Sequence, residues 1–160
     1  MLALLDAYGD HDGSVGALYD EGLAGYPPCA YVEAVTGDHW FEELGYLLPA
    51  RRHYLRAAEL DPTCPTHQYQ LGLLYHMLGI PEVSVEHFRR AVALAGQDHS
   101  EVAARARFNW AAHLVNREHA REQAAGLLRE ALQLMPNYPE ARDTLARLEA
   151  ARPRGGLFGR

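Results

Sequence analysis

Histidine and cysteine are two residue types of this sequence that could bind a metal or assist catalysis. The chain has nine histidines and two cysteines, Cys29 and Cys64. Zinc sites are typically recognised by His-x3-His or Cys-x2-Cys pairs, and neither pair occurs. The sequence therefore predicts no metal site. The histidines are interpreted as solvated or rim residues, and the cysteines as thiols in turns, with a weak redox role left open.

Motifs of covalent catalysis and phosphate binding are also missing from the sequence. Gly155 and Gly156 follow no predicted strand, so they do not form a phosphate-binding loop. No Gly-x-Ser-x-Gly elbow occurs, and neither cysteine has a base nearby in sequence. These observations predict a protein that is not an enzyme and uses no cofactor. A site assembled from residues on different helices is the alternative that an activity screen, with and without zinc, would test.

Length and composition predict one globular domain. The chain has 160 residues, of which 48% are hydrophobic and 22% charged. No apolar run approaches the ~20 residues that cross a bilayer, and the first residues lack the basic region of a signal peptide. With only two cysteines, these features predict a cytoplasmic protein without membrane association. All basic residues are arginine, which together with frequent alanine, leucine and glycine is typical of a GC-rich bacterial genome.

Charge is distributed unevenly along the chain. No lysine or arginine precedes Arg51, and the acidic residues of that stretch give it a charge of about −9. Since the whole chain has a charge of −6, the remainder carries about +3. An acidic front and a basic rear favour a partner surface or head-to-tail self-association, whereas a solvated acidic face is the alternative. The net acidity argues against a nucleic-acid partner, because such proteins carry a basic surface.

A helical hairpin is predicted in the middle of the chain and recurs with a regular period. Leu71, Leu74, Tyr75 and Leu78 share one face of a helix, and the break at 79–81 precedes a second helix that ends near residue 96. The second-helix pattern recurs around an aromatic or leucine residue, at spacings of 35, 34 and 40 residues. These residues are Tyr19, Tyr54, Phe88 and Leu128.

The hairpins resemble the tetratricopeptide repeat (TPR) family, whose period is ~34 residues. Leu71, Gly72 and Tyr75 match its Leu-Gly-x2-Tyr signature. The family's preferred Trp, Ala and Pro are replaced by Gln68, Ser84 and Gly96. The resemblance implies an all-α protein: a right-handed superhelix of antiparallel helical hairpins, or α-solenoid, with about three repeats and a C-terminal capping helix. It also implies an adaptor that binds other proteins.

Three segments are expected along the chain. Residues 1–27 are predicted to form a degenerate helical pair, and residues 28–152 the repeat domain with a capping helix over 138–152. Residues 153–160 are predicted to be a flexible tail.

Two repeats depart from the family pattern. In the first, Thr36-Gly37-Asp38 interrupts a helix predicted over 31–44, so we expect a kink or split with Trp40, Phe41 and Leu44 still buried. The last spacing implies about six extra residues, which we place at 96–100. In the last repeat, Trp110 and Ala111 fit the Leu-Gly positions best, which leaves one extra residue in the turn at 118–120.

The resemblance implies that the first helix of each hairpin lines a concave partner-binding groove. The groove residues carried over are Tyr69, Gln70, Leu73, His76 and Met77 in the middle repeat, Arg105, Phe108, Asn109, Ala112 and Asn116 in the last, and Val35, His39, Glu42 and Glu43 in the first.

These residues suggest how a partner is held. Arg105 and Asn109 suit a carboxylate or a peptide backbone, and an apolar anchor could meet Tyr69, Phe108 and Met77. Packing of Phe108 and Met77 between repeats is an equally weighted alternative. Without lysine, the chain does not match the carboxylate-binding set of chaperone-binding TPR domains. The predicted partner is an unidentified protein or peptide, and the alternative function is a self-assembling homo-oligomeric scaffold.

Overall fold

The computed structural model describes residues 29–43, 45–96, 99–115 and 118–150. The predicted N-terminal pair, the tail at 153–160, Leu44 and Asn116 lie outside the described residues. Within those ranges the chain forms seven α-helices and no strand. No helix in the described ranges is both long and apolar enough to cross a membrane.

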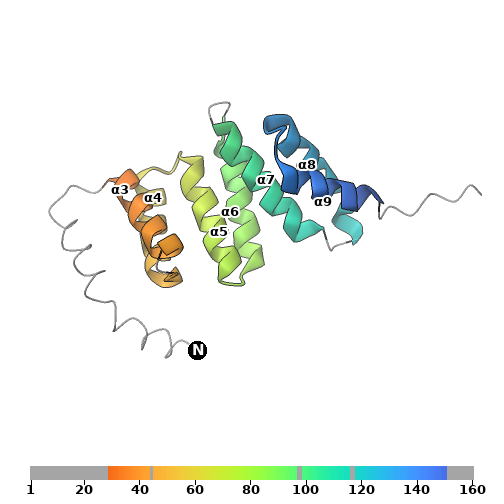
Figure 1. Ribbon diagram of the computed structural model, residues 1–160. Coiled ribbons are helices and arrows are strands. Elements are labelled where there is room, and N and C mark those ends of the chain that lie inside the picture. Colours follow the sequence, from red (N-terminus) through yellow and green to blue (C-terminus); the bar gives the residue numbers. More distant parts are fainter. Residues whose placement is uncertain (1–28, 44, 97–98, 116–117, 151–160) are drawn as a thin grey trace, which may run out of the picture.

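The helices form three antiparallel hairpins and a final single helix, which stack in a row (Figure 1). The elements are α3 (Ala30–Asp38), η1 (His39–Glu43), α4 (Leu47–Leu60), α5 (Pro65–Met77), α6 (Pro81–Leu94), α7 (Ser100–Leu114), η3 (Glu118–Ala120), α8 (Arg121–Leu134) and α9 (Pro139–Ala150). The hairpins are α3/α4, α5/α6 and α7/α8. This architecture confirms the predicted α-solenoid of three repeats with a C-terminal cap.

Proline and glycine mark the helix boundaries. Pro65, Pro81 and Pro139 are the first residues of their helices, where the fixed φ is already helical and the missing N–H would have no partner within the helix. Gly79 has φ +72° in the turn of the middle hairpin, a conformation that costs other residues free energy. Local sequence therefore sets where each of these helices begins or turns.

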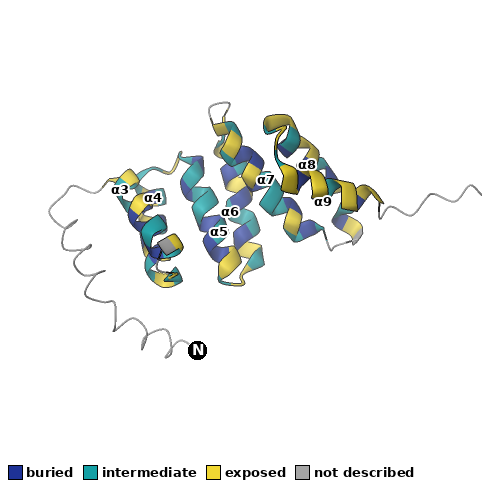
Figure 2. Cartoon of the chain, viewed as in Figure 1, coloured by how far each residue is buried: buried dark blue, intermediate teal, exposed yellow. Residues whose placement is uncertain are grey.

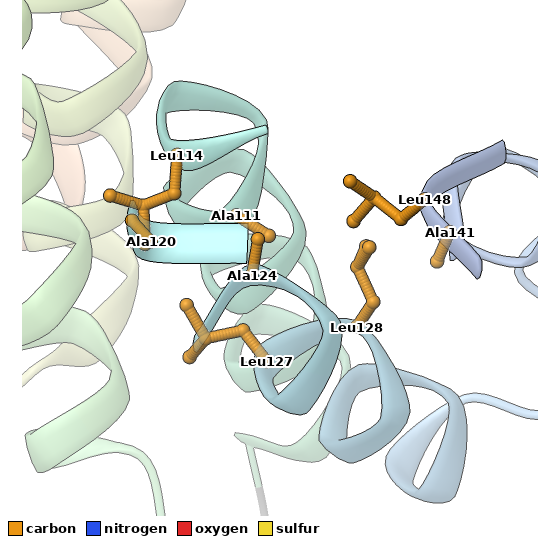
Figure 3. Packing of buried hydrophobic residues seen from close by; sticks show 8 residues of the cluster. All are labelled: Ala111, Leu114, Ala120, Ala124, Leu127, Leu128, Ala141 and Leu148. Carbon is orange, nitrogen blue, oxygen red and sulfur yellow. The ribbon is translucent and has the colours of Figure 1, made fainter. Parts of the chain in front are cut away.

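The core runs between the helices, and buried residues lie on the sides that face neighbouring helices (Figure 2). The cluster drawn in Figure 3 joins the last hairpin to α9 through Ala111, Leu114, Ala120, Ala124, Leu127, Leu128, Ala141 and Leu148. Ala141 and Leu148 come from α9, whose opposite side is exposed. The predicted capping helix is thus confirmed.

The first helix of the first hairpin is not split at Thr36-Gly37-Asp38. At His39 the α-helix continues as a π-helix, and Trp40 is buried as expected whereas Phe41 is half-buried. A β-carbon on Gly37 would lie 2.6 Å from the Tyr54 ring, so Gly37 occupies the close crossing of α3 and α4. Tyr54 follows Gly37 by 17 residues, whereas Phe88 follows Gly72 by 16. The wider π turn takes up the additional residue.

Most extra residues of the last repeat lie in α7, so placing them at 96–100 was wrong. Ala111 occupies the position of Gly72 and is fully buried. It lies eleven residues after Ser100, the start of α7, whereas Gly72 lies seven after Pro65, the start of α5. The difference is about one helical turn. The single extra residue expected in the hairpin turn lies in the segment between α7 and α8 that contains the short 3-10 helix η3.

Candidate binding face

The first helices of the hairpins, α3, α5 and α7, form one side of the solenoid, which we call the A-helix face. Gln70 Nε2 on α5 donates to Asp38 Oδ1 on α3 at 2.6 Å. Between α5 and α7, the rings of His76 and His113 meet edge to face with centroids 5.1 Å apart. The A-helix face is therefore continuous across the three hairpins.

The predicted groove residues lie on this face with at least part of each described side chain accessible. His76, Met77, Arg105, Ala112, Val35 and Glu42 are exposed, and Tyr69, Gln70, Leu73, Phe108, Asn109 and His39 are half-buried. Asn116 and the side chain of Glu43 lie outside the description. A side chain must be accessible to contact a partner, and the described groove residues meet this condition.

Four side chains form a polar cluster where α5, α7 and the start of α9 meet: Tyr69, Arg105, Asn109 and Tyr138. Asn109 Nδ2 donates to the Tyr69 hydroxyl at 3.4 Å and to the carbonyl of Arg105 at 3.0 Å. Burial raises the pKa of Tyr69, although Arg105 and Asn109 favour its phenolate. Both the hydroxyl and the guanidinium can therefore donate hydrogen bonds at neutral pH.

Tyr138 belongs to the polar cluster but was missed by the sequence analysis. Burial, and then Tyr69, raise the pKa of Tyr138 to about 12, against the influence of Arg105. The TPR resemblance assigned binding residues only to the first helix of each hairpin. Tyr138 instead precedes the capping helix α9. In the sequence, only its aromatic side chain in the turn before α9 could have suggested a role for Tyr138. Its position beside α7 depends on how α9 packs on the last hairpin.

Arg105 carries the exposed positive charge of the polar cluster. Its guanidinium contacts Glu101 Oε1 at 2.8 Å, one helical turn earlier, and both side chains are about half or more exposed. Partial burial opposes the charge, but Glu101 holds the pKa of Arg105 above its ordinary value. Exposed pairs at this spacing contribute only about 0.3–0.5 kcal/mol, so a partner's carboxylate can replace Glu101 at small cost.

Gln70 contacts the protein itself with both ends of its amide. Its Nε2 donates to Asp38 Oδ1, which also accepts from the Tyr54 hydroxyl at 2.8 Å. Its Oε1 lies 3.5 Å from His67 Nδ1. The amide therefore connects α3, α4 and α5 through Asp38, and this internal role was not anticipated from the sequence.

The apolar candidates differ in their surroundings. The ring of Phe108 packs against Tyr138 with centroids 5.0 Å apart, as the packing alternative expected. Met77, in contrast, is 61% exposed at the end of α5. On α3, Tyr31 is 74% exposed and Val35 41%. Met77 and Val35 thus remain available as apolar contacts, and Tyr31 adds one that the sequence analysis did not name.

Comparison with known proteins identifies the architecture. No family model matches the sequence, and no curated protein matches it. A structure of MamA is 18% identical with a TM-score of 0.71, over 91% of this chain and 80% of that chain. The first TPR of Spaghetti (RPAP3), bound to an HSP90 peptide, is 24% identical with a TM-score of 0.65, over 76% of this chain and 91% of that chain.

This chain has a tetratricopeptide-repeat fold. The second TPR domain of human RPAP3, in complex with an HSP70 peptide, agrees with this assignment at a TM-score of 0.60 and 19% identity, over 76% of this chain and 98% of that chain. Sequence identity at these levels identifies the fold alone, because one fold hosts many functions. The function of this TPR chain must therefore be argued from its own side chains.

Proposed function

We propose that this TPR protein is a non-enzymatic interaction module that binds an extended segment of another protein on the A-helix face, over the polar cluster. The observation that carries the proposal is the exposed Arg105 beside the Asn109 amide and the Tyr69 hydroxyl. These groups supply several donors to one accessible site. Such a module would act as an adaptor in the cytoplasm.

The polar cluster suits a segment that presents a carboxylate or backbone carbonyls. A guanidinium binds carboxylates with paired hydrogen bonds, and the ion pair that Arg105 would exchange is the one with the exposed Glu101. Met77, exposed on the neighbouring helix α5, can contact an apolar side chain of the same segment. The two RPAP3 structures named above contain HSP90 and HSP70 peptides, which supports peptide binding by this fold.

Selection from a displayed library of random peptides tests the proposal. We expect the wild-type protein to enrich peptides that contain an acidic or C-terminal carboxylate near an apolar residue. Arg105→Ala should weaken binding of the selected peptides at least tenfold. Arg90→Ala is the matched control, because Arg90 also pairs with a glutamate one turn earlier, Glu86, but on the second helix α6.

Two results would contradict binding on the A-helix face. One is a library from which the wild-type protein enriches no peptide family. The other is equal loss of binding in the Arg105→Ala and Arg90→Ala variants, since this would show a charge effect without a defined site.

Self-assembly is the alternative function, and light scattering after size exclusion distinguishes it. A partner-binding module is expected to elute as a monomer at high micromolar concentration. A discrete oligomer that dissociates at high salt would instead favour assembly through opposite charges.

A further inference from the structure

We propose that Asp61, Cys64 and His67 bind a zinc ion at the turn between α4 and α5. One ligand atom from each side chain lies within 4.8 Å of the other two. Asp61 follows the last residue of α4, Cys64 precedes α5, and His67 lies in its first turn. The proposal is independent of peptide binding, because none of the three residues belongs to the polar cluster.

The donor set matches the chemistry of zinc. Thiolate sulfur, imidazole nitrogen and carboxylate oxygen bind zinc at about 2.0–2.3 Å, whereas magnesium and calcium prefer oxygen alone. Ligand atoms around a tetrahedral zinc ion lie about 3–4 Å apart, so small side-chain rotations would close the present separation. Three protein ligands leave a fourth position for water or for a side chain of a partner.

The backbone turn does not need these three residues. The equivalent turn between α8 and α9 has Met135, Tyr138 and Ala141 in their places. Asp61 has φ −134° and ψ 87°, and Met135 has φ −136° and ψ 81°. In both turns this residue donates its N–H to the carbonyl four residues earlier at 2.9 Å. The same turn therefore forms without any metal-binding side chain, and the backbone geometry alone does not require Cys64 or His67.

His67 is an unusual residue for its position. It is 5% exposed, and the corresponding positions of α7 and α9 hold Ala106 and Ala141, both fully buried. A ring that carries two polar nitrogens thus replaces a methyl group in the packed part of the helix. A buried polar group needs partners, and a metal ion would satisfy one of the two nitrogens.

Gln70 favours the tautomer of His67 that keeps a lone pair on Nε2. Because Gln70 Nε2 donates to Asp38, its Oε1 is the atom that faces His67 Nδ1, at 3.5 Å. A proton on Nδ1 suits this oxygen and leaves the lone pair on Nε2. Zinc-binding histidines commonly donate their second nitrogen to an oxygen in this way, which fixes the tautomer and the ring orientation.

The carboxylate of Asp61 is held in place by Thr63. Its Oδ1 accepts hydrogen bonds from the Thr63 hydroxyl at 2.8 Å and the Thr63 N–H at 3.1 Å. These bonds orient the carboxylate of Asp61 beside the side chains of Cys64 and His67.

Titration of the reduced full-length chain with zinc alone, followed by calorimetry, tests the site. We expect one ion per chain. Cobalt alone should give a sulfur-to-cobalt charge-transfer absorption, because Cys64 supplies a thiolate. Cys64→Ser should abolish this absorption and weaken zinc binding at least tenfold, and His67→Ala should weaken it similarly. Since alanine occupies the equivalent positions of α7 and α9, His67→Ala should keep the fold, which circular dichroism checks.

Cys29→Ser and His119→Ala are the matched controls, because both residues are exposed and lie outside the proposed site. Both variants should bind zinc as the wild type does. The proposal is overturned if the wild-type chain binds no zinc, if Cys64→Ser retains wild-type affinity, or if Cys29→Ser loses affinity equally. If His67→Ala fails to fold, the comparison of Cys64→Ser with Cys29→Ser still decides the question.

Discussion

Gly72 lies directly against the ring of Phe88, so closely that a β-carbon at position 72 would lie 2.5 Å from Cε1 of Phe88. The same relationship holds between Gly37 and the Tyr54 ring in the first hairpin, at 2.6 Å. In both hairpins the aromatic ring comes from the second helix and fills the space that glycine leaves on the first. The glycine therefore sets how closely the two helices pack.

Gly72→Ala is expected to destabilise the protein. The added methyl group would overlap a ring that is itself fully buried, so the helices must move apart. We expect the free energy of unfolding to fall by about 1–3 kcal/mol, despite the better helix propensity of alanine. Thermal or urea unfolding measures the change.

Gly126→Ala is the matched control, because it makes the same substitution inside α8 with no atom within 4 Å of the added β-carbon. Without a clash, the gain in helix propensity should raise the free energy of unfolding by roughly 0.5–1 kcal/mol. Changes of the same sign in the two variants would contradict the role assigned to the Phe88 contact.

Asp38 and Tyr54 are expected to be energetically coupled. The Tyr54 hydroxyl is buried and donates to Asp38 Oδ1 at 2.8 Å. Tyr54→Phe should cost about 1.5–3 kcal/mol in the wild type, because the lost bond involves a charged acceptor. In an Asp38→Ala background the same change should cost less than about 0.5 kcal/mol. A double-mutant cycle by urea unfolding measures the difference, and additive effects would show that the bond contributes nothing.

Arg105→Ala should separate partner binding from stability. Its side chain is about half exposed and its ion pair is with an exposed glutamate, so the free energy of unfolding should fall by no more than about 0.5 kcal/mol. Tyr69→Ala should behave differently, because the Tyr69 ring packs on Phe88 with centroids 5.9 Å apart. We expect it to cost about 2 kcal/mol or more. Tyr69→Phe, which keeps the ring and removes the hydroxyl, is therefore the better binding variant.

Alkaline pH should destabilise the protein partly through Tyr138. Its pKa rises from 10.0 to about 12 on folding, so the unfolded chain loses this proton first. The stabilisation is complete below about pH 10 and is lost as the pH rises toward 12. The melting temperature of the wild type should fall more steeply in that interval than that of Tyr138→Phe. Equal slopes would indicate that Tyr138 is as accessible in the folded chain as in the unfolded one.

The helices and their pairing could be predicted because the responsible patterns are local. Leu71, Gly72 and Tyr75 lie within one or two helical turns, and the recurring spacing of Tyr54 and Phe88 identifies the repeat. The resemblance to the TPR family also implied that Arg105 and Asn109 lie on an accessible side of α7, where Arg105 is exposed and Asn109 half-buried. The proposed roles of these residues in binding remain predictions.

Contacts between repeats and across turns could not be predicted in the same way. The convergence of Asp61, Cys64 and His67 depends on the backbone dihedral angles of a four-residue turn, and the pairing of Gln70 with Asp38 depends on how α5 packs against α3. Tyr138 joins the polar cluster only because α9 packs on the last hairpin. Sequence periodicity determines which side of a helix is buried, but the distance and rotation between helices follow from side-chain packing. Those two quantities decide which functional groups meet.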